Sequence, residues 1–428
     1  LLGGQRTVWY GGIIIMCGHI VLAIPSDHTF FIGLILVATG TGLLKPNISA
    51  LVGHLYAEDD VRRDSGYALY YMGINIGSVL GYMICGYFGE KVGWHWGFGA
   101  AAVGMAIGLI QYRKTIGNLG DASLKPEHPM TTEGAKKAWS TIWAIVGAVV
   151  VITTLTMSGV IAFDPVAVAK YVAVAFTVIF FAYYAYIYFG GQLSQAEKKR
   201  MWALFLVCVA SACFWSGFEQ AGSSLNLFGR DYTDRMLGSF AIPASWFQNV
   251  NPMFIIILSP FFAALWINLG KRMISPSYGL KCAIGLIIMA TGFIVMFFAA
   301  QQAAQGLKVA PMWLVTTYFL HTVGELCLSP VALSAVSKLS PRRFAGQMMG
   351  VFVLTYSIGN IIAGLLAGNF DPNNVSELPN LYLQIAIFSI GIGAVIALIS
   401  LKSKSWEGQG EDHIEAVEPA EAPAKTVG

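Results

Sequence analysis

The chain has 428 residues, of which 56% are hydrophobic and only 11% are charged. A soluble domain carries about 25% charged residues, so this composition, with a mean hydropathy of +0.64, predicts a polytopic helical membrane protein whose surroundings are a lipid bilayer. The formal net charge is +3. No basic stripe with interleaved aromatic residues occurs, so no nucleic acid is expected as a partner.

Twelve apolar segments are long enough to cross about 30 Å of hydrocarbon as helices, at 1.5 Å per residue. In chain order they are predicted at residues 7–24, 29–53, 66–88, 94–112, 139–162, 166–189, 200–228, 246–269, 278–300, 310–337, 344–368 and 381–401. The sequence therefore predicts an all-α fold.

The connectors between these segments differ in charge. One alternate set, together with both ends of the chain, holds 19 of the 26 Lys and Arg residues, and the other set holds four: Lys91, Arg230, Arg235 and Lys308. By the positive-inside rule, the first set and both chain ends are predicted to face the cytoplasm. The tail from residue 403 is acidic and rich in Ala and Pro, which predicts disorder.

Lys45, in the stretch GTGLLKPNIS, lies deep in one apolar segment. A lysine near the middle of a membrane helix costs roughly 2.5–3.5 kcal/mol, so a partner or a function is expected for it. Two carboxylates, Glu219 and Glu325, also lie inside apolar segments. One interpretation is a buried ion pair that only holds helices together, although it leaves one carboxylate unexplained. The other is a cleft where one cation and two carboxylates bind a zwitterion, with a proton or salt bridge controlling opening.

Helical spacing places further side chains beside these charges. Three pairs are four residues apart and so share a helix face: Trp215 and Glu219, Tyr71 and Asn75, and Glu325 and Ser329. Asn251 precedes Pro252 just inside another segment, where the proline is expected to free a backbone carbonyl. His321, one turn before Glu325, has two interpretations, a proton relay or a histidine that packs between helices.

Catalytic motifs are missing from the sequence. It contains no HExxH, no GxSxG and no cluster with metal-ligand spacing. We therefore expect neither an enzyme nor a bound metal. A membrane-embedded hydrolase is the rival that release of amino acids from an offered dipeptide would support.

Several stretches resemble one known family. FIGLILVATGTGLLKPNISALVG followed by DSGYALYYMGINIGSVLG is similar to the paired signature of the proton-dependent oligopeptide transporter (POT/PTR) family of the major facilitator superfamily. The later helices of that family resemble, in order, FWSGFEQAGSSLNLF, NPMFIIILSP, GELCLSPVALS and GQMMGVFVLTYSIGN. The resemblance covers residues 1 to about 402. It implies two helical bundles around a central cavity and, as in bacterial members, two extra helices inserted between them.

On this resemblance the chain divides into four parts. These would be an N-terminal bundle (1–115, helices 3–6 only), a cytoplasmic linker with two extra transmembrane helices (116–198), a C-terminal bundle (199–402, helices 7–12) and a disordered tail (403–428). The opening LGGQRTVWYGG resembles the end of the family's loop between helices 2 and 3. Helices 1 and 2 are therefore expected to be absent from this sequence, and with helix 1 the family's ExxERF motif.

The resemblance also implies a role for each site residue. Lys45 would face the substrate carboxylate and exchange a salt bridge with Glu219, while Glu325 would bind the substrate's amino terminus. The remaining substrate-binding residues would be Tyr71, Asn75, Trp215, Asn251, Ser329 and Phe352. Phe352 stands where the family often has Trp, and Val79 is a second departure from its signatures.

The sequence thus predicts a bacterial inner-membrane symporter that imports di- and tripeptides together with protons by alternating access. The proton gradient would be its energy source, and no cofactor is expected. Two alternatives stay open: a relative that carries nitrate or another anion, and a receptor that binds peptides without transporting them.

Overall fold

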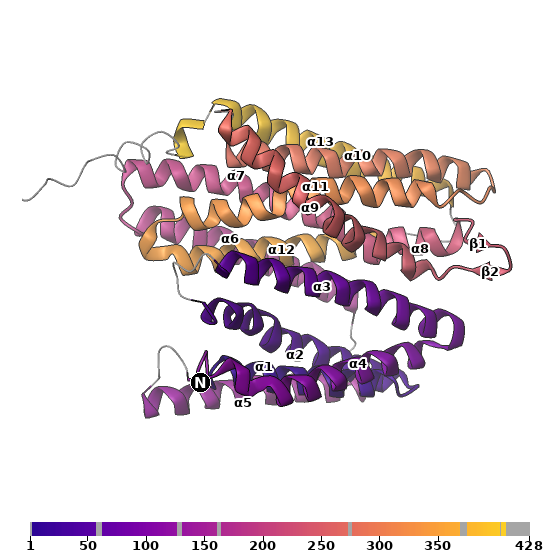
Figure 1. Ribbon diagram of the computed structural model, residues 1–428, viewed down its shortest axis with the longest axis horizontal. Helices are drawn as coiled ribbons and strands as arrows, with labels where there is room; N and C mark the ends of the chain where they lie inside the picture. Colours follow the sequence, from indigo (N-terminus) through magenta and orange to yellow (C-terminus); the bar gives the residue numbers. More distant parts are fainter. Residues whose placement is uncertain are drawn as a thin grey trace, which may run out of the picture. The chain divides into compact units, whose positions relative to one another are not determined.

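The structure is a computed structural model that describes residues 2–56, 62–125, 131–160, 164–272, 276–368, 375–402 and 404–407. Most of these residues are helical (Figure 1). Contacts divide the chain into two compact units, the first made of Leu1–Asp164 with Leu237–Met253, and the second of Pro165–Met236 with Phe254–Gly428.

The first unit is built from long helices joined by short helical turns. α1 packs against both α2 and α4, and α3 packs against the turn η5. The helices are α1 (Gly4–Leu22), α2 (Asp27–His54), α3 (Arg62–Tyr87), α4 (Trp94–Thr115) and α5 (Thr132–Met157), and the turns are η1 (Phe88–Val92), η2 (Ile116–Leu119) and η5 (Ala244–Asn249).

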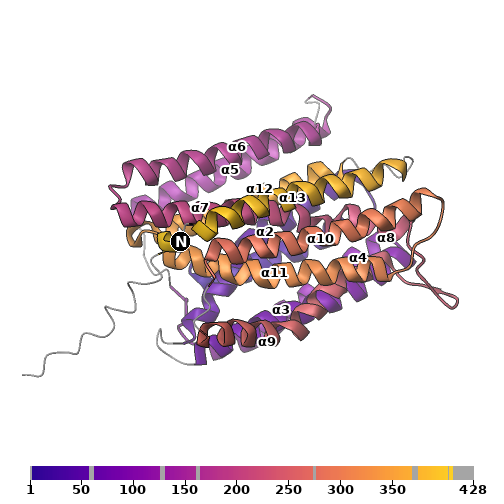
Figure 2. The ribbon, with the colours of Figure 1, turned by 90° about the horizontal axis from the view of Figure 1, so that it is seen from above.

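The second unit has a well-buried interior around α10, which lies between α11 and α13 (Figure 2). Leu286, Met289 and Phe293 on α10 are fully buried. Its long helices are α6 (Pro165–Ala185), α7 (Gln195–Phe218), α10 (Tyr278–Ala304), α11 (Met312–Leu339), α12 (Ala345–Ala367) and α13 (Leu378–Lys402).

Shorter elements connect these helices. α9 (Val250–Lys271) begins in the first unit and continues into the second, and a two-stranded sheet of β1 (Met236–Leu237) and β2 (Phe240–Ala241) precedes it. The others are η3 (Tyr186–Gly190), η4 (Glu219–Gly222), α8 (Ser224–Asp231), η6 (Arg342–Phe344), η7 (Val375–Glu377) and η8 (Lys404–Glu407).

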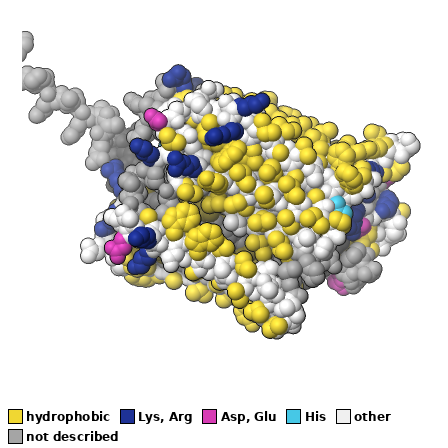
Figure 3. Space-filling view, turned by 90° about the horizontal axis from the view of Figure 1, so that it is seen from below, with side chains coloured by type: hydrophobic (Ala, Val, Ile, Leu, Met, Phe, Trp, Pro, Cys, Tyr) yellow, Lys and Arg dark blue, Asp and Glu magenta, His cyan; other side chains and the backbone are white. Residues whose placement is uncertain are grey.

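The composition of the helices is that of a multi-pass membrane protein. Within the described residues, ten helices are long and apolar enough to cross a membrane, and apolar side chains cover most of the face shown in Figure 3. All twelve predicted segments contain a helix. α1 and α4 are not among the ten.

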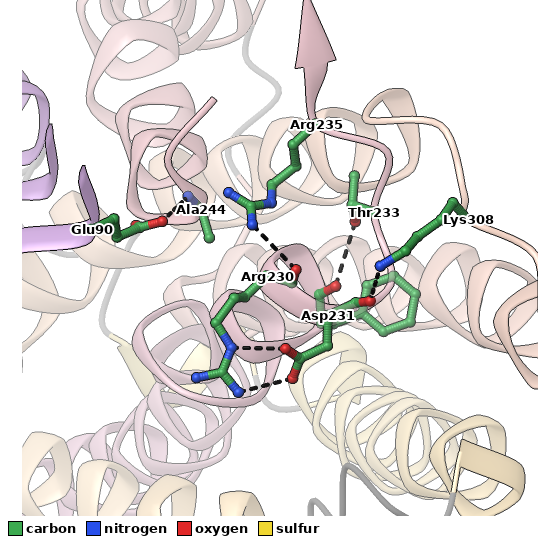
Figure 4. Close-up of polar contacts among 8 residues, drawn as sticks. Glu90, Arg230, Asp231, Thr233, Arg235, Ala244 and Lys308 are labelled. Atoms are coloured by element: carbon green, nitrogen blue, oxygen red, sulfur yellow. Dashed lines mark hydrogen bonds and ion pairs between the residues drawn. The ribbon is translucent and has the colours of Figure 1, made fainter. Parts of the chain in front are cut away.

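Three cations from the Lys- and Arg-poor connectors gather around the end of α8 (Figure 4). Arg230 pairs with Asp231 at 2.7 Å, Arg235 Nη2 donates to the Arg230 carbonyl at 3.3 Å, and Lys308 Nζ donates to the Asp231 carbonyl. The last carbonyls of a helix lack intrahelical partners and carry partial negative charge. These cations therefore stabilise the end of α8.

α5 stands apart from its neighbours. No residue in the most apolar part of its span is buried. A groove of about 440 Å³ separates it from α2, lined by Ile, Leu, Val and Thr side chains. The Thr39 and Thr154 hydroxyls in this lining donate to carbonyls of their own helices, so the groove is apolar in character.

The predicted segment 200–228 is not one continuous helix. α7 ends at Phe218, η4 follows, and α8 begins at Ser224. Ser223 has φ −126° and ψ −100°, outside the helical region. The break falls in EQAGSS, because Gly and Ser are weak helix formers, and it places Glu219 at the end of a helix.

Other boundaries also differ from those expected from the sequence. Pro252 is the third residue of α9, in the first turn, where N–H groups lack intrahelical acceptors in any case; Pro260 is the proline in the helix interior. Of the two helices expected to be inserted between the bundles, α5 lies in the first unit and α6 in the second. Disorder was expected from residue 403, whereas Lys404–Glu407 form η8; residues 408–428 lie outside the described part.

Candidate functional site

Lys45 lies on α2 directly before Pro46, where the continuous helix lacks one backbone hydrogen bond. Pro46 has no N–H, so the Gly42 carbonyl loses its usual intrahelical donor. Two polar side chains bond to the backbone around this point: Asn47 Nδ2 donates to the Leu43 carbonyl at 2.8 Å, and Ser49 Oγ donates to the Lys45 carbonyl at 3.1 Å. The Lys45 side chain is exposed, so it is available to a ligand.

Tyr71 and Asn75 share one face of α3, as their spacing predicted. Asn75 Nδ2 donates to the Tyr71 carbonyl at 2.9 Å, and the Asn75 side chain is buried while Tyr71 is exposed. Asn251 is the second residue of α9 and follows η5, which packs on α3. The first unit therefore places both predicted asparagines on neighbouring elements.

An aromatic cluster occupies the junction of α7 and α12 in the second unit. The Trp215 ring lies 5.0 Å from that of Tyr356 and 5.2 Å from that of Phe218, centroid to centroid, and Phe352 lies 5.1 Å from Tyr356. Phe352 is 0% exposed. It therefore supports Tyr356 from within the unit instead of forming the surface of a pocket.

Glu325 and Ser329 lie on α11, which packs against α7 and α12. These two helices are the ones that carry the aromatic cluster. Ser329 Oγ is buried and has no hydrogen-bond partner among the described residues. Because buried polar atoms are nearly always hydrogen-bonded, Ser329 is a candidate to bind a ligand or water.

Glu219 owes its position to the residue that follows it. Gln220 is fully buried and its Nε2 donates to the Ala363 carbonyl on α12 at 3.0 Å, while Ser224 Oγ donates to Gln220 Oε1 at 2.6 Å. These bonds connect the break after α7 to α12 and to the start of α8. Gln220 therefore fixes the turn that carries Glu219.

His321 is enclosed by aromatic rings. Its ring centroid lies 4.9 Å from that of Phe293 and 6.2 Å from that of Phe218. Both ring nitrogens are buried without a hydrogen-bond partner among the described residues. This environment favours the helix-packing interpretation over a proton relay, which needs a hydrogen-bonded path.

The described residues contain no group of three or more His, Cys, Asp and Glu side chains arranged to hold a metal.

Two residues were missed at the sequence level, Tyr356 and Gln220. Tyr356 is four residues after Phe352 in GQMMGVFVLTYSIGN, the same spacing that identified the other pairs. Gln220 directly follows Glu219 within an apolar run. Its fully buried amide could have been suspected, because an isolated polar residue in a membrane helix tends to bond to a neighbouring helix.

The fold and these residues define a multi-pass helical membrane protein with a few charges inside its spans. The POT family model matches residues 5–382. The chain belongs to the POT family, which confirms the resemblance read from the sequence motifs.

Relatives and solved structures agree with this membership. The chain is 40% identical over 414 residues to a peptide transporter of Yersinia enterocolitica, an alignment covering 93% of this chain and 80% of the relative. It is 30% identical over 410 residues to a di-/tripeptide transporter of Lactococcus lactis, covering 93% and 80%. A crystal structure of a peptide transporter POT in complex with sulfate matches with a TM-score of 0.87 and 35% identity, covering 95% of this chain and 82% of that one.

Proposed function

We propose that this protein imports di- and tripeptides together with protons by alternating access. The observation that carries the proposal is the position of Glu325, a carboxylate on the membrane helix α11, which packs against both helices of the Trp215–Tyr356 cluster, in a chain whose named relatives transport peptides. An amino terminus needs an anionic partner in a water-poor site. A carrier of nitrate has no use for such a carboxylate.

Each end of the peptide has a proposed partner. Lys45, exposed on α2, binds the carboxylate end, and Glu325 binds the amino end with Ser329 one turn away. Asn75 and Asn251 bind the peptide amide groups, with Tyr71 beside them. Trp215 and Tyr356 form the apolar wall, and we place Phe352 behind that wall because it is buried.

Proton coupling is assigned to Glu219. In this proposal Glu219 and the peptide carboxylate compete for Lys45, and protonation of Glu219 releases the lysine. The position of Glu219 at the end of α7, held by the buried bonds of Gln220, gives this carboxylate a fixed place from which to act. The proton gradient supplies the energy, and the chain itself performs no chemical reaction on the peptide.

The proposed location is the bacterial inner membrane with both ends of this chain in the cytoplasm. The distribution of Lys and Arg among the connectors supports this orientation.

The decisive measurement is uptake of radiolabelled dialanine by the full-length protein in liposomes, with and without an inward proton gradient. Accumulation that depends on the gradient and is lost in Glu325→Gln is the expected result. Equal uptake with and without the gradient would contradict coupling. No uptake of peptide, together with uptake of nitrate, would show that the substrate is nitrate and not a peptide.

A further inference from the structure

Glu90 makes a contact that the peptide site does not use. It lies in η1, the π-helical turn after α3, and its carboxylate accepts three hydrogen bonds. The donors are the backbone N–H of Ala244 at 2.8 Å, the backbone N–H of Ser245 at 2.8 Å and Ser245 Oγ at 2.7 Å. Figure 4 shows the Glu90 carboxylate directed at the Ala244 nitrogen.

The geometry on both sides is suited to this contact. Ala244 and Ser245 are the first residues of η5, whose leading N–H groups have no acceptor within the turn. A carboxylate is the strongest acceptor a side chain can offer there. Beside it, Trp246 Nε1 donates to the Met83 carbonyl at 3.1 Å. Gly86 is also required, because a Cβ there would lie 2.2 Å from Ser245 Oγ.

The contact joins two elements that carry proposed peptide-binding residues. α3 carries Asn75, and η5 leads directly into α9, which carries Asn251. Glu90 is fifteen residues beyond Asn75 (90 − 75), which is about 22 Å at 1.5 Å per helical residue. It is too far to touch a peptide held by Asn75, so its role is to position these elements.

We propose that Glu90, Ala244 and Ser245 form a latch that keeps the non-cytoplasmic end of the transporter closed and that opens once in each transport cycle. The inference rests on the proposed function. Glu90 lies in a connector of the Lys- and Arg-poor set, which the charge distribution assigns to the non-cytoplasmic side. α9 runs on from Met253 into the second unit, so any movement of that unit relative to α3 acts on the latch.

The chemistry of the latch suits repeated opening. All three donors are N–H or O–H groups rather than a second buried charge. Water that enters an opening end can replace each of these bonds, both at the carboxylate and at the start of η5. Separation of Glu90 from η5 therefore leaves no charge unsolvated in an apolar environment. Breaking a buried ion pair, by contrast, would leave such a charge.

Cross-linking tests whether the latch must open. In the full-length protein with Cys85→Ala, the pair Glu90→Cys and Ser245→Cys is joined by a short bifunctional methanethiosulfonate reagent, and dialanine uptake into liposomes is measured. Uptake is expected to fall at least tenfold and to return after reduction. The controls are each single cysteine variant treated with the same reagent. Unchanged uptake, with the cross-link verified by mass, would overturn the latch.

A second measurement does not depend on uptake. Labelling of Ser245→Cys by a membrane-impermeant maleimide is expected to be several-fold faster when Glu90→Gln is also present. The Gln amide has one acceptor oxygen in place of two, and its NH2 group faces the remaining backbone donor of η5. Labelling of Ser239→Cys, an exposed position in the turn between β1 and β2, is the matched control. Equal Ser245→Cys rates with and without Glu90→Gln would overturn the latch, whereas absence of dialanine uptake by the unmodified protein would overturn only the proposed function.

Discussion

Trp215 on α7 and Tyr356 on α12 meet at a ring-centroid distance of 5.0 Å with an interplanar angle of 64°. This contact joins two helices that are far apart in sequence, and α11, which carries Glu325, packs against both of them. The aromatic cluster and the buried Gln220 network are therefore both held by packing within the second unit.

Removal of the Lys45 charge should abolish most peptide uptake. Lys45→Ala deletes the proposed partner of the peptide carboxylate, and losing a charge-assisted hydrogen bond costs about 1.5–3 kcal/mol, or roughly 10–100-fold in affinity. The measurement is the KM for dialanine in liposomes. Lys170→Ala, which removes an exposed lysine on α6, is the control and should leave the KM unchanged.

Neutralising Glu325 should remove the preference for a free amino terminus. Glu325→Gln is expected to weaken dialanine competition by about 10–100-fold while leaving N-acetyl-dialanine almost unaffected. Competition against a labelled reporter peptide measures both. The same preference for dialanine in the variant and the unmodified protein would show that Glu325 does not bind the amino group. Glu377→Gln on the exposed turn η7 is the matched control.

A methyl group at Gly359 should destabilise the second unit. A Cβ at this position would lie 2.7 Å from Trp215 Cβ and 2.8 Å from the Ala212 carbonyl, and overpacking of this kind typically costs 1–3 kcal/mol. Gly359→Ala is therefore expected to lower the thermal unfolding midpoint in detergent. Gly364→Ala on the same helix has no atom within 4 Å and should not lower it.

The buried Gln220 network should contribute to stability. Gln220→Leu leaves Ser224 Oγ without its acceptor at 2.6 Å and removes the donor to the Ala363 carbonyl. Unpaired buried groups cost about 1–3 kcal/mol. Thermal unfolding should show this loss, whereas Gln302→Leu at an exposed position of α10 should have little effect. Equal unfolding midpoints would contradict the role given to Gln220.

Docking of η8 should depend on pH through Glu407. Its carboxylate accepts from the Tyr278 N–H at 3.0 Å and the Gly279 N–H at 3.4 Å, and burial raises its pKa above the usual 4.5 despite these bonds and the nearby Lys281 and Lys404. A raised pKa in the docked state means that this state holds the proton more tightly. Docking is therefore most stable below pH 4.5 and weakens as the pH rises through the raised value.

A spin label at Ser405→Cys, next to this contact, measures the effect. Its mobility is expected to increase as the pH rises above 4.5. In Glu407→Gln the side chain stays neutral, so the mobility should no longer change with pH. A pH response that persists in Glu407→Gln would assign the titration to another group.

The sequence predicted the helices well because membrane spans need long apolar runs, and their family because the motifs around Lys45 and Glu325 are specific. It did not predict the break after Phe218, since EQAGSS is short and its effect depends on the Gln220 bonds to α12. It also did not predict the burial of Phe352. Spacing identifies a shared helix face, but only packing against neighbouring helices decides which residue of that face reaches the surface.

α5 shows how loosely some of the chain is constrained. Its most apolar stretch has no buried residue, so neighbouring side chains constrain the shapes of the residues there only weakly. Exchange of Val for Leu or Ile along this helix is therefore expected to cost almost no stability, provided that its length and hydrophobicity are kept.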